Sequence, residues 1–309
     1  MTGWKATTRA ALSGLYKYSG AMTLHESIAH LVGFRFMTIV LFHRVTDLIP
    51  EDGLTVSVDR FRRICTLMAQ RFRVVPLGEV FRIARSGEPM PPRTLAITFD
   101  DSYRDNLQAA QILAELGLPA TFFIPTSFIG SDRTFEWDRD LPAMPNLSWE
   151  DVRSMVRLGF EIGSHTVSHA NMGVIGPDQA RAELTMSRAI IEEQTGARCR
   201  WFAYPFGGKH HFRPEYIPMI AETGYDGGVS AFGGFVRPGI DARVLPREAL
   251  PYFRSLAHLE LFLSGCLHWL YALKGRSHET ELNAPWNPLT SPVKPLCPLA
   301  LRELIHGPS

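Results

Sequence analysis

The chain has 309 residues, of which 45% are hydrophobic and 20% charged, and this composition excludes a disordered or fibrous protein. Its 32 Lys and Arg residues balance its 31 Asp and Glu residues, so no overall positive field draws the chain to nucleic acid. The four cysteines are scattered without a C-x-x-C pair, which argues against a cysteine zinc site or a disulfide framework.

Buried strands and amphipathic helices are predicted to alternate from residue 36 onward. Short apolar, β-branched runs predict strands at 36–42, 74–75, 94–99, 120–124, 160–163, 200–204 and from 225. Helical spacing of apolar residues predicts helices at 61–68, 77–85, 109–116, 152–159, 177–196 and 214–223. This alternation favours an α/β fold with parallel strands, in which about seven strand–helix units close into a (β/α)7-type barrel with extra helical segments at both ends. An open doubly wound sheet is the alternative.

The two ends of the chain differ in pattern from this central part. Residues 1–35 are loosely patterned and are expected to form an N-terminal extension, followed by a single α/β domain over 36–254. Residues 255–309 are expected to form a packed helix and a Pro-rich tail, and peripheral membrane contact through 255–274 is the alternative. The sequence shows neither a signal-peptide pattern nor an apolar run long enough to span a bilayer, so the expected location is the cytoplasm.

Polar and turn-forming residues follow four of the predicted strands. These are His43, the pair Asp100 and Asp101, the pair His165 and His169, and the turn Tyr204-Pro205-Phe206-Gly207. The carboxyl ends of parallel strands meet at one edge, so these residues are expected to lie together. No G-x-G-x-x-G or P-loop pattern follows any strand, so a nucleotide site has no support.

The residue types at this edge are typical of a metal site. Two imidazoles and one carboxylate form a facial ligand set with positions left for water and substrate, and the second carboxylate is then free to act as a base. Each motif alone has a structural alternative: an N-capped helix for Asp100 and Asp101, a core histidine for His43, and a simple turn for residues 204–207. Their joint occurrence after successive strands favours the metal site.

The combination of Thr98-Phe-Asp-Asp101, Ser164-His-Thr-Val-Ser-His169 and Tyr204-Pro-Phe-Gly207 resembles the polysaccharide deacetylases. This is the NodB-homology group, also called carbohydrate esterase family 4, and the resemblance covers about residues 36–250. It implies a distorted (β/α) barrel, a divalent metal that is usually zinc, and hydrolysis of N-acetyl or similar acyl groups on sugars.

The resemblance also implies roles for individual residues. Asp100 corresponds to the general base, and Asp101, His165 and His169 correspond to the metal ligands. The segment of Tyr204, Pro205, Phe206 and Gly207 corresponds to the lining of the acetyl pocket, with the Phe206 N–H helping to hold the oxyanion.

The chain departs from the common family pattern in two places. Ala203 stands where the third motif usually has an Arg that orients the base, and the C-terminal L-x-I-x-x-H motif is missing. Both departures are similar to the poly-N-acetylglucosamine deacetylase subgroup, in which an early Y/F-H motif supplies the acid. This resemblance makes His43, in Leu41-Phe-His-Arg44, the candidate acid. Arg247 is a candidate for the missing guanidinium, and a structural ion pair is its alternative.

The expected function is therefore metal-dependent N-deacetylation of an amino sugar in a polysaccharide, as in exopolysaccharide biosynthesis, or in a glycan precursor. A catalytically inactive carbohydrate-binding barrel and a metal-dependent amidase for a small acylated amine are the alternatives. The sequence shows no pattern that sets an oligomeric state. Four aromatic residues on predicted rim loops are interpreted as loop anchors, with sugar stacking as the alternative: Tyr103, Trp137, Trp149 and Phe232.

Overall fold

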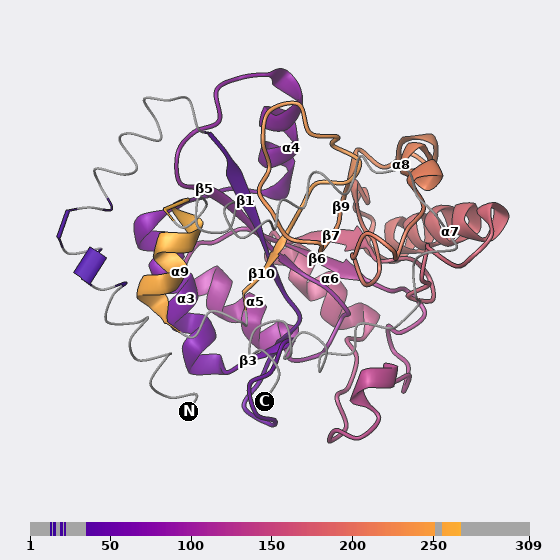
Figure 1. Cartoon of the computed structure of the whole chain (residues 1–309). Coiled ribbons are helices and arrows are strands. Elements are labelled where there is room, and N and C mark those ends of the chain that lie inside the picture. Colours follow the sequence, from indigo (N-terminus) through magenta and orange to yellow (C-terminus); the bar gives the residue numbers. More distant parts are fainter. Residues whose placement is uncertain are drawn as a thin grey trace, which may run out of the picture.

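The computed structural model describes residues 35–250 and 255–266, together with Ser13, Leu15, Tyr16, Ser19, Gly20 and Met22 (Figure 1). Its strands are β1 (Met37–Phe42), β2 (Arg44–Val45), β3 (Thr55–Val56), β4 (Arg73–Val74), β5 (Thr94–Phe99), β6 (Ala120–Ile124), β7 (Glu161–Ser164), β8 (Trp201–Ala203), β9 (Gly227–Val229) and β10 (Glu248–Ala249). Its helices are α3 (Val58–Arg71), α4 (Leu77–Ser86), α5 (Asn106–Glu115), η1 (Glu136–Asp138), α6 (Trp149–Arg157), α7 (Pro177–Thr195), η2 (Pro214–Tyr216), α8 (Ile217–Glu222) and α9 (Leu256–Leu263).

The main sheet is parallel throughout, in the order β10-β1-β5-β6-β7-β8-β9, with β4 beside the start of β5. Leu245 forms a parallel bridge with Val229 of β9, and Glu248 and Ala249 pair with β1. The segment 245–249 therefore joins the two edges of the sheet. The expected distorted parallel (β/α) barrel is confirmed, and the open sheet is excluded by this closing segment.

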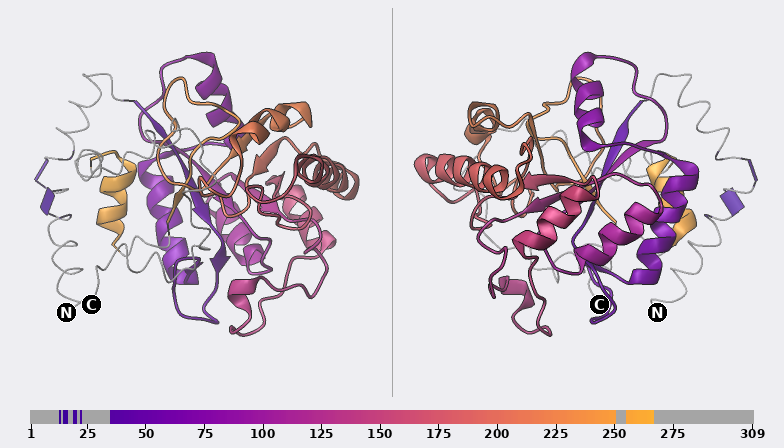
Figure 2. Two further views of the ribbon diagram at one scale, coloured as in Figure 1. Left: turned by 45° about the vertical axis from the view of Figure 1, so that its right-hand side comes forward. Right: turned by 180° about the vertical axis from the view of Figure 1, so that it is seen from behind.

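Alternate strand residues face the surrounding helices and form the larger core. Phe42, Phe99 and Phe122, from three neighbouring strands, stack with ring centroids 5.4 and 4.6 Å apart. Helices α3, α5, α6 and α7 cover this face and contact one another in chain order (Figure 2). The apolar faces predicted from helical spacing are the faces that these helices bury.

The remaining strand residues point into the barrel and form a second core. Ile39, Ala96, Phe123 and Ala203 belong to it, each two positions from another inward residue on its strand. The Phe123 ring fills the space beside Gly163, where a Cβ atom would lie 2.4 Å from the ring. Gly163 thus allows Phe123 to occupy the centre of the barrel.

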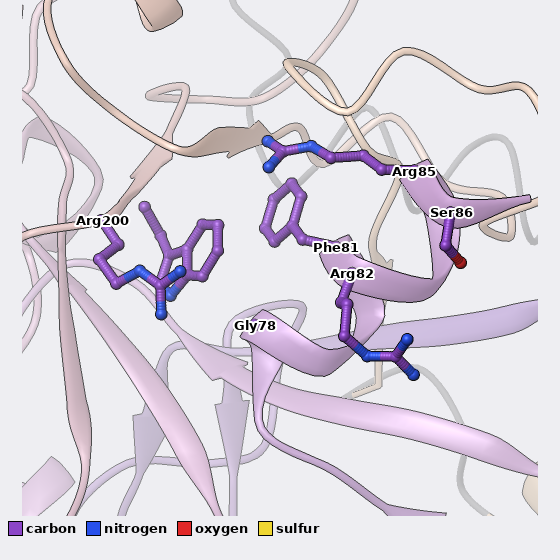
Figure 3. A pocket seen from close by; sticks show the side chains of 7 residues that line it. Gly78, Phe81, Arg82, Arg85, Ser86 and Arg200 are labelled. Carbon is purple, nitrogen blue, oxygen red and sulfur yellow. The ribbon is translucent and has the colours of Figure 1, made fainter.

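Helix α4 closes the barrel at the amino ends of the strands. Its Phe81 stacks on Trp201, the first residue of β8, with centroids 4.3 Å apart and planes 2° apart. The guanidinium of Arg85 lies over the Phe81 ring and that of Arg200 lies over the Trp201 ring, and these side chains line a surface hollow (Figure 3). This stack of four side chains covers one end of the inner core, so the opposite end is left to form the site.

The predicted C-terminal helix is partly described. Helix α9 ends at Leu263, whereas the apolar run continues to 273, and the residues from 267 onward lie outside the described part. Leu259 and Phe262 of α9 pack into the larger core, and the buried Glu260 pairs with Arg71 of α3 at 2.9 Å. Most of the expected 1–35 extension and all of the Pro-rich tail also lie outside the described residues. No described helix combines the length and the apolar character that crossing a bilayer requires.

Candidate active site

The alternation of inward and outward residues brings the candidate site residues to one end of the barrel. Asp100 is two residues beyond Thr98 of β5, and His165 is two beyond Gly163 of β7, so both continue the inward-facing rows. Arg247 likewise lies two residues beyond Leu245, which belongs to the inner core. All three side chains are buried, with at most 3% of each residue exposed. Because residues two positions apart on a strand point the same way, a carboxylate, an imidazole and a guanidinium all lie in one buried layer at this end of the barrel.

Asp101, His165 and His169, here called the Asp–His–His set, form a compact group of metal-ligand atoms. Their candidate ligand atoms all lie within 4.8 Å of one another. Asp101 Oδ1 is 3.5 Å from His165 Nε2 and 3.3 Å from His169 Nε2. Two ligand atoms bound at about 2.1 Å to a tetrahedral ion would be about 3.4 Å apart. The spacing therefore fits a divalent ion between the three side chains.

Electrostatics and hydrogen bonds favour the protonation states in which the Asp–His–His set can bind a cation. Burial alone would raise the pKa of Asp101, but its contacts with His165 and His169 hold that pKa well below its usual range. Burial lowers the pKa of His169, so its imidazole is neutral at neutral pH. The backbone oxygen of Ala203 lies 2.8 Å from His165 Nδ1 and accepts its proton in the tautomer that leaves Nε2 free to bind a metal.

The loops that carry the set are held in an unusual backbone conformation. Of the six non-glycine residues with positive φ in the described chain, four belong to these loops, and a fifth, Phe206, lies on the loop after β8; the four are Asp101, Ser102, Thr166 and His169. Each such residue costs on the order of 1–2 kcal/mol, so the surrounding structure must enforce it. The packing of the surrounding chain therefore holds the backbone of the Asp–His–His set in this conformation.

Glu183 of α7 fixes the loop between the two histidines, and the sequence analysis missed it. Its carboxylate accepts hydrogen bonds from the backbone N–H groups of Val167 and Ser168 at 2.7 and 3.0 Å, and from the Ser168 hydroxyl at 2.6 Å. The available signal was an acidic residue beside Leu184 on the otherwise small and apolar buried face of α7.

Asp100 lies beside the set but is bound to Arg247. The two guanidinium nitrogens donate to its two carboxylate oxygens at 2.8 and 2.6 Å, and Arg247 Nε donates to the Ser230 carbonyl at 2.7 Å. Burial would raise the pKa of Asp100, but Arg247 and then His165 lower it below its ordinary value. Arg247 thus provides the guanidinium that the motif arginine, absent at Ala203, would otherwise provide to Asp100. Ala203 itself contributes its backbone oxygen, which lies beside His165.

His43 lies at the same end of the barrel, directly after β1. Its carbonyl oxygen accepts a hydrogen bond from Asn106 at 2.7 Å, and its buried Nδ1 has no hydrogen-bond partner within the described chain. Burial lowers the pKa of His43, against the opposing effect of Asp101 and Asp100. The structure therefore places this imidazole in the field of both carboxylates.

The predicted 204–207 segment divides between the core and the site. Tyr204 is fully buried in the outer core, where it packs on Phe212 and donates to the Arg243 carbonyl, so it does not line a pocket open to substrate. The reason is strand phase, because Ala203 faces inward and Tyr204 therefore faces outward. Pro205 is buried, Phe206 is 44% exposed with its ring 4.7 Å from that of His169, and a Cβ on Gly207 would lie 2.3 Å from Ala231.

Comparison with known proteins identifies the domain that carries this site. The family model described as polysaccharide deacetylase matches residues 87–227, which include both aspartates, both histidines and the 204–207 turn. Residues 87–227 belong to the polysaccharide deacetylase family. The NodB-type family expected from the three motifs is confirmed.

Individual relatives of this deacetylase domain are distant. The chain is 28% identical over 143 residues to the putative polysaccharide deacetylase YxkH of Bacillus subtilis, which is 46% of this chain and 46% of that protein. It is 29% identical over 171 residues to a chitooligosaccharide deacetylase of Sinorhizobium fredii, covering 52% of this chain and 68% of that one. The match thus spans less than half of YxkH.

Solved structures support the same fold. The Streptococcus pyogenes deacetylase PplD, in complex with acetate, aligns with a TM-score of 0.62 at 22% identity, covering 72% of this chain and 96% of that one. IcaB from Ammonifex degensii also aligns with a TM-score of 0.62, at 21% identity, covering 74% of this chain and 97% of that one. At these identities the structural likeness establishes the barrel fold alone.

Proposed function

We propose that this polysaccharide deacetylase domain is a metal-dependent hydrolase that removes acetyl groups from N-acetylated amino sugars of a polysaccharide or glycan precursor. One observation carries the proposal: a buried Asp–His–His set lies beside a second carboxylate, Asp100, that is bound to Arg247 and stays outside the set. The names of the relatives, which include a chitooligosaccharide deacetylase, support the same substrate class.

The ligand chemistry favours a divalent ion, with zinc as the first candidate. Asp101, His165 and His169 would hold it through one oxygen and two nitrogens, a donor set that zinc accepts readily. When bound there, the ion would lower the pKa of a coordinated water and polarise the acyl carbonyl.

The residues outside the set have complementary roles in this proposal. Asp100 accepts the proton of the attacking water, and Arg247 keeps its carboxylate ionised and fixed in direction at neutral pH. The Phe206 N–H, which donates no hydrogen bond to another described residue, helps to hold the developing oxyanion. His43 delivers a proton to the amine, because an unprotonated amine anion is a very poor leaving group.

The inactive-barrel alternative loses its main support in this geometry. Ala203 was the sequence feature that favoured it, and Arg247 now provides the guanidinium on Asp100. The proposed subgroup, similar to the poly-N-acetylglucosamine deacetylases, is consistent with the position of His43 after β1.

Acetate release tests the proposal directly. The purified chain should release acetate from N-acetylated oligosaccharides, lose this activity with a chelator and regain it with Zn²⁺. Asp100→Asn should retain the metal but lose turnover by about 10²–10⁴-fold, and His43→Ala should lose a comparable factor. Activity that survives both substitutions would refute the assigned roles. Turnover of only a small acylated amine would favour the amidase alternative.

A further inference from the structure

Trp137 stands beside the Asp–His–His set on a different loop, the one that follows β6. It belongs to the short helix η1 and is half-buried. Its ring centroid lies 5.6 Å from that of His169, with the planes at 67°, and 5.9 Å from that of Phe206, with the planes at 78°. Trp137 and the partly exposed Phe206 therefore meet beside a candidate metal ligand.

The surroundings of Trp137 leave only carbon surface exposed. Phe135 stacks on one face of the indole, with centroids 4.7 Å apart and planes 11° apart. The indole Nε1, its only polar atom, donates to the Tyr103 hydroxyl at 3.0 Å. The exposed part of this half-buried side chain is therefore apolar and borders the site.

A buried polar network fixes the orientation of the indole. The Tyr103 hydroxyl donates to Asp138 Oδ2 at 2.6 Å, and the other oxygen of Asp138 pairs with Arg44. Arg44 also donates to Asp52 and to Thr55, both at 2.9 Å. Arg44, Tyr103 and Asp138 are each no more than 2% exposed.

This network connects three parts of the site. Arg44 directly follows His43, Tyr103 is two residues after Asp101, and Asp138 is the neighbour of Trp137. Burying an ion pair costs several kcal/mol of desolvation per ion, so apolar packing would anchor the loop at lower cost. A network of directional bonds instead fixes one orientation of the ring.

We propose that Trp137 and Phe206 form a wall on which the sugar ring carrying the reacting acyl group stacks, and that Tyr103, Asp138 and Arg44 are positioning residues for Trp137. The inference rests on the proposed function. A pyranose ring has an apolar face of C–H groups, which suits a wall whose exposed surface is carbon. A small acylated amine has no such face and would gain nothing from the wall.

Kinetics on two substrates test the wall. Trp137→Ala should raise KM for an N-acetylated oligosaccharide about tenfold, with a smaller change in kcat and unchanged metal content. KM for a small acylated amine should not change. Trp137→Phe, which keeps an aromatic face, should retain most of the affinity, and Tyr103→Phe should give an intermediate KM. Trp149→Phe, at the start of α6 and packed against the larger core, is the matched control. An unchanged oligosaccharide KM in Trp137→Ala would overturn the proposal.

A binding measurement separates this proposal from the proposed activity. In Asp100→Asn, the N-acetylated oligosaccharide should change tryptophan fluorescence, and the change should disappear when Trp137→Phe is added but remain when Trp149→Phe is added. Such binding without wild-type turnover would support the wall and refute the activity. Turnover with a fluorescence change that survives Trp137→Phe would refute the wall, and neither binding nor turnover would refute both.

Discussion

Replacing Arg247 with Met tests the Asp100–Arg247 pair. The substitution keeps an unbranched side chain but removes four hydrogen bonds, two of them to Asp100 and one each to Thr98 and the Ser230 carbonyl. Both side chains are buried, with relative exposures of 0% and 4%, so solvent does not screen the uncompensated carboxylate. Breaking one side of a buried ion pair costs about 3–5 kcal/mol of unfolding free energy. We expect a loss of this size at neutral pH.

The loss should depend on pH in a defined direction. In the wild type the folded-state pKa of Asp100 lies below the ordinary value of 3.8, so the contribution of the pair is present above about pH 4 and disappears as the pH falls through the folded-state pKa. Without Arg247, burial raises the folded-state pKa above the unfolded one. The variant's deficit should therefore grow as the pH rises above about 4 and shrink as the pH falls below about 4.

Denaturant unfolding with circular dichroism, in chelator at several pH values, measures this deficit. The double variant Asp100→Asn/Arg247→Met should recover much of the lost stability, because it removes the buried charge, yet it should remain inactive. Metal content of Arg247→Met should stay near that of the wild type, since Arg247 contacts none of the ligand atoms. A deficit that is independent of pH and unrelieved in the double variant would refute the reasoning.

Three further predictions concern metal binding by the Asp–His–His set. Asp101→Ala, His165→Ala or His169→Ala should each abolish stoichiometric metal binding in elemental analysis, and full occupancy in any of them would contradict the ligand set. Glu183→Gln should weaken metal affinity by about 10–100-fold in a chelator competition, because it loosens the loop between the histidines. Burial lowers the pKa of His165, but the charges of Asp100 and Asp101 outweigh burial and raise this pKa above 6.5. Metal affinity should therefore already decrease as the pH falls from about 8 towards 6.5, because protons then compete with the metal for His165. A metal affinity that is independent of pH over this range would contradict this prediction.

Most of the barrel could be predicted from sequence because its signals are local. The strands 94–99 and 120–124 have the predicted bounds, and α7 ends before Gly196, whose φ of 68° suits a glycine cap. The two-residue strands β2, β3 and β10 were missed, because none of them contains two adjacent apolar β-branched residues like the Val74-Val75 pair that predicted the strand at 74–75. Tyr204 was assigned to the site from its motif, and only the phase of β8 shows that its ring faces the outer core.

The site was predictable where polar residues directly follow strands and less so where partners come from remote segments. His43, Asp100, Asp101, His165 and His169 all follow buried strands, and they do meet. Glu183 and the buried network around Trp137 depend on contacts between loops and helices that no spacing rule encodes. The contact between Arg247 and Asp100 spans 147 positions in sequence, and only the missing arginine at Ala203 pointed to it.

The alternation of inward and outward residues along β5 also limits which insertions and deletions this strand can accept. Thr98 and Asp100 share the inner row, while Leu95, Ile97 and Phe99 belong to the outer core. Deleting one codon within this strand would exchange the rows, carry the Phe99 ring to the Asp–His–His set and move a carboxylate among the packed phenylalanines. Natural variation in this stretch should therefore consist of substitutions, with insertions and deletions confined to the loops at either end.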